Sequence, residues 1–123
     1  KGMLEGIGFE SARLLGICDR LGLRVTDLRV LGGGARSARW LQLSSDVLGV
    51  PVERPALSWA AALGAAILAG VGGGVYASVS EGATTVVRVA DRFEPDERRH
   101  ARYRNKQAQY WALSTKLAGL SLE

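Results

Sequence analysis

Apolar residues in the first part of the chain recur at the three- and four-residue steps of one helix face. The positions on this face are Leu4, Ile7, Ser11, Leu14, Cys18 and Leu21. Gly22 follows them and suits a left-handed helix cap. The pattern therefore predicts a first helix that ends at about residue 21, with Cys18 as a small core residue.

A short apolar run at residues 25–31 is typical of a buried strand, and three glycines follow it in the sequence Gly32-Gly33-Gly34-Ala35-Arg36-Ser37. Ser37 is a suitable N-cap for a second helix over residues 37–48, which Gly49 would end. A strand that ends in glycines and leads into a helix presents free N–H groups and a positive dipole end, which favour phosphate. A plain tight turn explains three glycines equally well.

The middle of the chain predicts a short strand and an apolar helix. Residues 50–52 favour an edge strand, because the residue before a proline prefers extended backbone. Residues 59–71 are apolar on all sides, which is typical of a buried helix. Ser58 would cap this helix and the glycines at 72–74 would end it. Residues 75–80 have room for one helical turn.

The last third of the chain predicts one strand and one long helix. The β-branched residues at 84–89 favour a strand, and Pro95 with the acids after it favours the start of a helix that runs to Leu117. Tyr103, Tyr110 and Leu117 lie on one stripe of that helix. Helices that alternate with short strands predict an α/β layered domain.

Composition excludes several classes of protein. With 123 residues the chain is one domain or part of one. A single cysteine and a single histidine exclude a disulfide framework, a zinc site and a His-rich metal site. No segment has the length of a membrane span and no secretory signal is present, so we expect a cytoplasmic protein with no membrane partner.

The formal net charge of +4 is spread along the chain, whereas a nucleic-acid binder more often concentrates it. One dense basic group lies on the last predicted helix, and we interpret it as a solvated face. Its members are Arg98, Arg99, Arg102, Arg104 and Lys106. The chain begins inside the first predicted helix, so we interpret residues 1–121 as a fragment of a longer domain, and Leu122-Glu123 as the remnant of an expression tag.

The glycine motif continues at positions whose spacing resembles the C-terminal domain of the FGGY family of carbohydrate kinases. These positions are Trp40, Gln42, Asp46, Gly49 and Pro51. Further matches are Ala62-Leu63-Gly64-Ala65-Ala66-Ile67-Leu68-Ala69, Leu4-Glu5-Gly6-Ile7, and the set Phe93, Pro95, Asp96, His100 and Tyr103. The last set is most similar to the xylulose kinases of the family. Trp59 stands where some members carry a glutamate.

The resemblance implies an actin-like, ribonuclease-H-like ATPase fold, of which this chain forms part of the second lobe. Carried over to this sequence, the expected nucleotide contacts are Gly32, Gly33, Gly34 and Ala35, with Arg36 and Ser37 at the mouth of the following helix. Gly33 and Gly34 would let the backbone lie against the nucleotide, where a β-carbon would collide. For Trp40, Gln42 and Asp46, helix packing and capping are favoured over ligand contact.

The reaction that the resemblance implies is ATP-dependent, Mg²⁺-assisted phosphorylation of a ketopentose, D-xylulose to D-xylulose 5-phosphate. The family's phosphate motif, sugar site and catalytic aspartate lie outside these residues. We therefore expect no catalytic residue and no metal ligand here, no kinase activity from this chain alone, and self-association through its apolar surface. Two alternatives stay open: an actin-like ATPase-fold regulatory or sensor protein, and a non-catalytic interaction or nucleic-acid module supported by the basic group.

Overall fold

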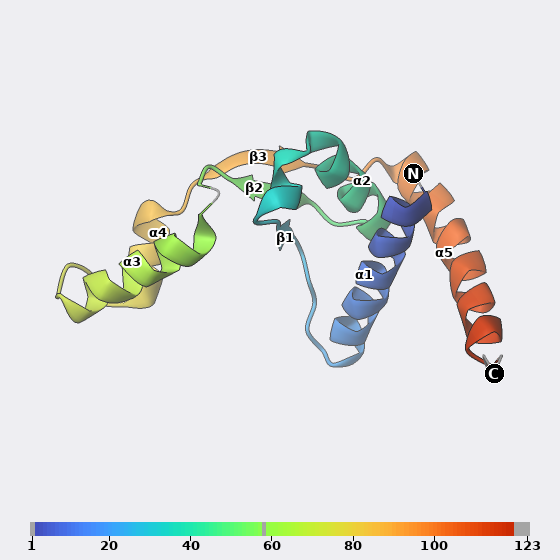
Figure 1. Cartoon of the computed structure of the whole chain (residues 1–123), viewed down its shortest axis with the longest axis horizontal. Coiled ribbons are helices and arrows are strands. Elements are labelled where there is room, and N and C mark those ends of the chain that lie inside the picture. The colour runs from blue at the N-terminus through green and yellow to red at the C-terminus, as the bar shows by residue number, and fades with distance from the viewer. Residues whose placement is uncertain (1, 58, 120–123) are drawn as a thin grey trace.

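The computed structural model describes residues 2–57 and 59–119 of the chain as a mixed α/β structure (Figure 1). Helices and strands alternate along most of it. The elements are α1 (Gly2–Arg20), β1 (Leu28–Arg29), the 3₁₀ turn η1 (Gly33–Arg36), α2 (Ala38–Leu48), β2 (Val52–Pro55), α3 (Ala60–Gly72), α4 (Val79–Val86), β3 (Val89–Phe93) and α5 (Glu97–Ala118).

The three described strands form one sheet in the order β1-β2-β3. β1 and β2 run parallel, with Leu28 opposite Val52, and the chain crosses between them through η1 and α2. β2 and β3 run antiparallel, with Arg54 opposite Asp91. β2 is therefore the central strand, and the prediction of an edge strand at residues 50–52 was wrong. The strand expected over residues 25–31 is present only at Leu28–Arg29.

The core lies where α2 packs between the sheet and the pair α1 and α5. Leu41 and Val47 on α2 and Val52 on β2 are fully buried. Phe9 on α1 contacts α5 through Tyr110, with ring centroids 5.4 Å apart. Burial of these side chains supplies most of the driving force for docking the helices.

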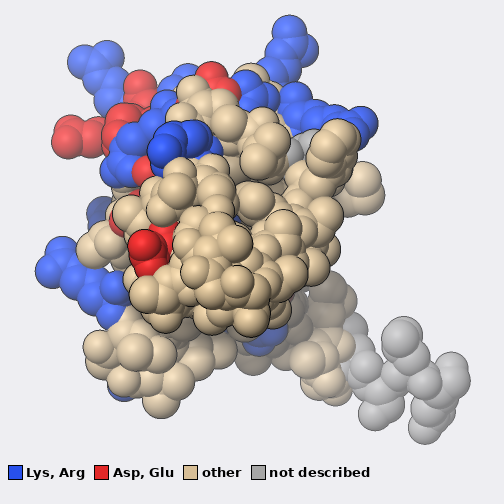
Figure 2. All heavy atoms as spheres, turned by 90° about the vertical axis from the view of Figure 1, so that its left-hand side faces the viewer, with Lys and Arg blue, Asp and Glu red and all other residues tan. Residues whose placement is uncertain are grey.

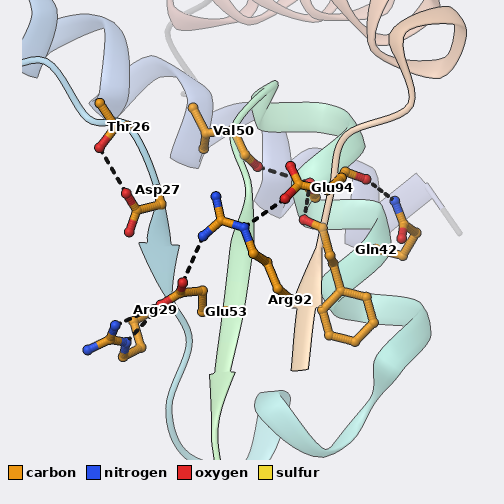
Figure 3. A network of polar contacts seen from close by, with 10 residues as sticks. Thr26, Asp27, Arg29, Gln42, Val50, Glu53, Arg92 and Glu94 are labelled. Carbon is orange, nitrogen blue, oxygen red and sulfur yellow. Dashed lines mark hydrogen bonds and ion pairs between the residues drawn. The ribbon is translucent and has the colours of Figure 1, made fainter. Parts of the chain in front are cut away.

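One buried carboxylate ties the three strands together (Figure 3). Glu53 on β2 accepts from Arg29 on β1, with Nη2 2.7 Å from Oε2, and from Arg92 on β3, with Nη1 2.7 Å from Oε1. Its side chain is only 11% exposed. The hydrogen bond from Arg29, followed by that from Arg92, lowers the pKa of the Glu53 carboxyl from its ordinary value of 4.5.

Local capping signals place most helix ends where the sequence predicts them. Gly22 and Gly49 both have positive φ, 77° and 71°, and follow α1 and α2. The Ser37 hydroxyl accepts from the Trp40 N–H at the start of α2, and Asp96 accepts from the Arg99 N–H at the start of α5.

α3 and α4 form a limb that stands apart from the sheet and the other helices (Figure 1). Ile67 is the buried residue of α3, and it packs toward α4 near Gly82. The prediction that this helix is buried was wrong: Leu68 is 61% exposed and Val75, just beyond the helix, 71%. Its apolar composition leaves a broad uncharged surface at this end of the molecule, which faces the viewer in Figure 2. Ser58, its expected cap, lies outside the described residues.

The strand expected at residues 84–89 was also wrong, because residues up to Val86 belong to α4. A pair of bonds similar to a capping box, shifted by one residue on the Glu81 side, explains why this helix forms despite its β-branched residues. Ser78 Oγ accepts from the Glu81 N–H at 3.1 Å, and Glu81 Oε2 accepts from the Ala77 N–H at 2.6 Å. The Thr84 hydroxyl donates back to the carbonyl of Ser80. The single helical turn expected at 75–80 is replaced by this eight-residue helix, and the strand begins at Val89.

Within residues 2–57 and 59–119, no helix combines the length and the apolar composition needed to cross a membrane. The predicted expression-tag remnant at residues 122–123 lies outside the described residues.

Candidate functional site

The three glycines form the entry to η1, and only the first is required by the backbone conformation. Gly32 has φ +79°, which side chains rarely adopt. Gly33 and Gly34 have no positive φ. A Cβ on Gly33 would meet nothing within 4 Å, and one on Gly34 would lie at ordinary contact distance, 3.5 Å, from Trp40 Nε1. The described fold thus has room for a β-carbon at both positions.

The turn also leaves backbone donors at its start. The first N–H that donates within the turn is that of Ala35, to the carbonyl of Gly32 at 3.2 Å. The N–H groups of Gly33 and Gly34 precede it and so have no partner inside the turn. Amides that are not used by the turn itself, beside a helix start, are suited to an anionic or polar ligand.

A cavity of about 230 Å³ lies beside this turn, at the carboxyl ends of the parallel strands β1 and β2. Ligands of α/β proteins commonly bind at this edge of the sheet. Its polar residues are Arg36, Arg54 and Asp91. Its other lining residues are Val30, Leu31, Gly32, Ala35, Pro55, Ala56, Leu57 and Ala90. The volume is below the ~300 Å³ of a small ligand site, so the cavity holds only part of a ligand.

Arg54 joins the turn to the sheet. Its Nε donates to Asp91 Oδ2 at 2.8 Å, and its Nη1 donates to the carbonyl of Ala35 at 3.3 Å. Sequence reasoning did not single out Arg54 or Asp91. The signal needed was the register of β2 against β3, and Asp91 fell in a predicted loop.

The predicted nucleotide contacts divide into three groups. Gly32, Ala35 and Arg36 line the cavity, and the Arg36 side chain is exposed. Gly33 and Gly34 lie in the same turn without lining the cavity. Ser37 is the N-cap of α2, where its hydroxyl accepts from Trp40 N–H at 3.3 Å.

Two further motif residues, Gln42 and Asp46, are used in packing. Asp46 is 3% exposed; its Oδ1 accepts from Gln42 Nε2 and from the Asp96 N–H, each at 3.0 Å. Its Oδ2 pairs with Arg99 Nε at 2.9 Å. Gln42 also donates to the carbonyl of Glu94 at 2.8 Å (Figure 3). These bonds hold the start of α5 against α2, and they confirm the packing interpretation for both residues.

The basic group on α5 is partly neutralised. Arg99 pairs with Asp46, and Lys106 Nζ lies 3.3 Å from Glu5 Oε2. Arg98, Arg102 and Arg104 are exposed, as expected for a solvated helix face. Among the described residues, no three His, Cys, Asp or Glu side chains gather as a metal site would require. The one carboxylate that lines the cavity, Asp91, is engaged by Arg54.

Comparison with known proteins gives a family and several relatives. Residues 1–73 match the C-terminal domain of the FGGY family of carbohydrate kinases. The chain is 36% identical over 104 residues to an autoinducer-2 kinase of Escherichia coli, covering 85% of this chain and 20% of that protein. It is 38% identical over 121 residues to a glycerol kinase of Dechloromonas aromatica, covering 91% and 24%.

A xylulose kinase of Rhodospirillum rubrum has a crystal structure that matches 94% of this chain and 23% of its own, with 28% identity and a TM-score of 0.79. The fold is therefore that of the C-terminal lobe of these kinases, as the sequence predicted. The chain spans about a fifth to a quarter of the length of these proteins. These relatives are named for three different substrates, so the comparisons do not favour xylulose kinases over the other two.

Proposed function

This chain belongs to the FGGY family of carbohydrate kinases, and we propose that its glycine turn binds the adenosine side of ATP in such a kinase. The observation that carries the proposal is the glycine at positions 33 and 34. The described fold has room for a β-carbon at both positions, so packing within the chain does not require glycine there. Close approach of a ligand to the backbone would explain why both residues lack a side chain. The cavity beside the turn and the cation Arg36 on its rim fit part of a nucleotide.

The proposed reaction transfers the γ-phosphate of ATP to a hydroxyl of a ketopentose, D-xylulose, in the cytoplasm. Phosphoryl transfer depends mainly on positioning and on charge neutralisation. This chain contributes the positioning of the nucleotide, through the apolar walls of the cavity and the backbone amides at the start of the turn. The residues that bind the sugar and the base that activates its hydroxyl lie elsewhere in the kinase. Pairing of Arg99 and Lys106 within the chain gives no support to a nucleic-acid partner.

Mg²⁺ fits the described residues poorly. The carboxylate beside the cavity, Asp91, is already paired with a guanidinium, and no acidic cluster lies near it among the residues described. Magnesium prefers several oxygen ligands, supplied in kinases by carboxylates, water and the phosphates of the nucleotide. The proposal therefore assigns no residue of this chain to the metal.

The test of the proposed site is the affinity of the full-length gene product for ATP, measured by calorimetry for Gly33→Ala and Gly34→Ala. We expect each substitution to weaken ATP binding by about tenfold or more, because a steric clash that costs about 1.4 kcal/mol of binding free energy gives that factor. The melting temperature should stay unchanged. Gly72→Ala is the matched control, because its Cβ, like that of Gly33, would meet nothing within 4 Å, and it lies on α3, which does not line the cavity. Wild-type ATP affinity in both turn variants would contradict the site.

The acceptor is tested separately. Initial rates of ATP consumption with D-xylulose, glycerol and autoinducer-2 rank the three acceptors suggested by the names of the relatives. We expect D-xylulose to have the highest kcat/KM. The alternative, an actin-like ATPase-fold sensor, predicts ATP binding without phosphorylation of any acceptor.

A further inference from the structure

We propose that Arg54 is a positioning residue for nucleotide binding, whose guanidinium latches the carbonyl of Ala35 and so holds the glycine turn in its ligand-binding shape. The inference rests on the proposed function of the turn. It concerns a residue that lies on a different element, β2, and that the sequence motif does not include.

The latch is anchored on both strands of the antiparallel pair. Arg54 and Asp91 stand directly opposite each other on β2 and β3. Asp91 Oδ2 accepts from both Nε and Nη2 of Arg54, which fixes the plane of the guanidinium. The remaining nitrogen, Nη1, is then directed to the carbonyl of Ala35 at 3.3 Å. The position of the turn is thereby set by the sheet.

The turn needs such an anchor because its own bonds are few. η1 is four residues long, and glycine at 32, 33 and 34 allows the unliganded backbone many conformations. Ala35 is the point at which the turn meets the rest of the molecule: its side chain is 7% exposed, and its carbonyl takes the bond from Arg54. A ligand that binds the turn therefore gains from having it already ordered.

Direct contact between Arg54 and the phosphates would give a different pattern, since Arg54 also lines the cavity. If Arg54 bound the phosphates directly, replacing it would weaken the binding of ATP more than the binding of AMP. A latch acts through the turn and so weakens AMP, ADP and ATP by the same factor. The double engagement of Arg54 with Asp91 and Ala35 favours the latch.

The test uses the full-length gene product with Arg54→Met and the control Arg92→Met. Arg92 also forms an ion pair across the sheet, with Glu53, and one with Glu94 just beyond its own strand, but none with η1. We expect Arg54→Met to weaken ATP, ADP and AMP alike by about tenfold, the effect of one lost hydrogen bond to a charged group. Amide hydrogen exchange should accelerate at residues 33–37. Arg92→Met should change neither quantity by more than about twofold.

Each other outcome overturns the latch: unchanged exchange at residues 33–37 in Arg54→Met, equal ATP affinity in the two variants, or a loss that grows with the number of phosphates. If the wild type binds no nucleotide, the proposed function fails, and the exchange measurement still decides whether the latch exists. If Arg54→Met does not fold, Asp91→Asn replaces it in both measurements, because this variant keeps Arg54 but neutralises its anchor. Faster exchange at residues 33–37 in Asp91→Asn supports the latch, and unchanged exchange overturns it.

Discussion

Gly49 is constrained twice, once by its own backbone and once by its neighbour His100. Its φ of 71° ends α2 in the left-handed region, and a Cβ would overlap the imidazole of His100 on α5. His100 Nδ1 lies 3.0 Å from the carbonyl of Asp46 in the last turn of α2. The missing side chain of Gly49 is thus the space in which α5 docks. Gly22 shares the positive φ but has nothing within 4 Å.

Replacing these two glycines by alanine separates backbone strain from packing. Gly22→Ala should lower the free energy of unfolding by about 1 kcal/mol, the cost of left-handed backbone for a residue with a Cβ. Gly49→Ala should lower it by about 3 kcal/mol, because displacing a packed side chain adds about 2 kcal/mol. Urea unfolding measures both. Equal effects would mean that the His100 contact carries no weight, and His100→Ala in the Gly49→Ala background should recover the difference.

At the scale of elements, the strands of the small sheet are joined by charge as well as by backbone hydrogen bonds. β1 is two residues long, yet Arg29 on it and Arg92 on β3 both reach the same buried carboxylate of Glu53. A buried carboxylate with two guanidinium partners stabilises the sheet only while it is ionised.

Stability should therefore depend on pH through Glu53. Its pKa is lowered in the folded protein, so its contribution is complete above about pH 4.5 and is lost as pH falls through the lower, folded value. We expect Glu53→Gln to be less stable than wild type at pH 7 and to lose less stability between pH 5 and pH 3. Thermal unfolding across this range measures the difference. Glu94→Gln is the control, since Glu94 is 64% exposed and, among the described residues, its carboxylate pairs with Arg92. Parallel pH curves for Glu53→Gln and wild type would refute the argument.

Elements whose signals are local could be predicted from the sequence, and those decided by pairing could not. Ser37, Gly22 and Asp96 act within their own turns, so the ends of α1, α2 and α5 follow from them. The position of β3 depends on its register with β2. The β-branched residues before it belong to α4 instead, whose start is fixed by the cap at Ser78. The same applies to the site: the glycine turn is visible in the sequence, whereas Arg54 meets Asp91 only through that register.

The whole molecule has two ends of opposite character. Charged residues gather on the sheet, α1 and α5, whereas residues 56–80 contain no charged residue at all. This uncharged stretch includes α3 and exposes Trp59, Leu68 and Val75. The limb lies at the end of the molecule that faces the viewer in Figure 2, where uncharged atoms predominate. Contiguous apolar surface of this kind is a site of association.

We expect the 123-residue chain to self-associate through this end at micromolar concentration. Leu68→Lys combined with Val75→Lys should shift the chain to monomer in sedimentation velocity, because burying a lysine in an apolar contact is unfavourable. Leu117→Lys is the control: Leu117 is also more than half exposed, but it lies near the end of α5, away from the limb. A monodisperse wild-type monomer would refute the expectation.

The chain by itself should transfer no phosphate. Its candidate cavity has room for only part of a nucleotide, and the carboxylate beside it is engaged by Arg54 rather than free to act as a base. Incubation with ATP and D-xylulose, followed by ³¹P NMR, should give no sugar phosphate above a control without protein. Product formation above that control would place catalytic groups within these residues.

The antiparallel pairing of β2 and β3 has one more consequence for how the limb is attached. The N–H of Ala56 donates to the carbonyl of Arg88 at 2.9 Å, directly beyond the ends of the two strands. In terms of connectivity, residues 57–87 are thus the loop of a β-hairpin whose base is already closed. Insertions at hairpin loops leave the paired strands undisturbed. The limb can accordingly differ in length or sequence among such domains without moving Arg54, Asp91 or the turn that they hold.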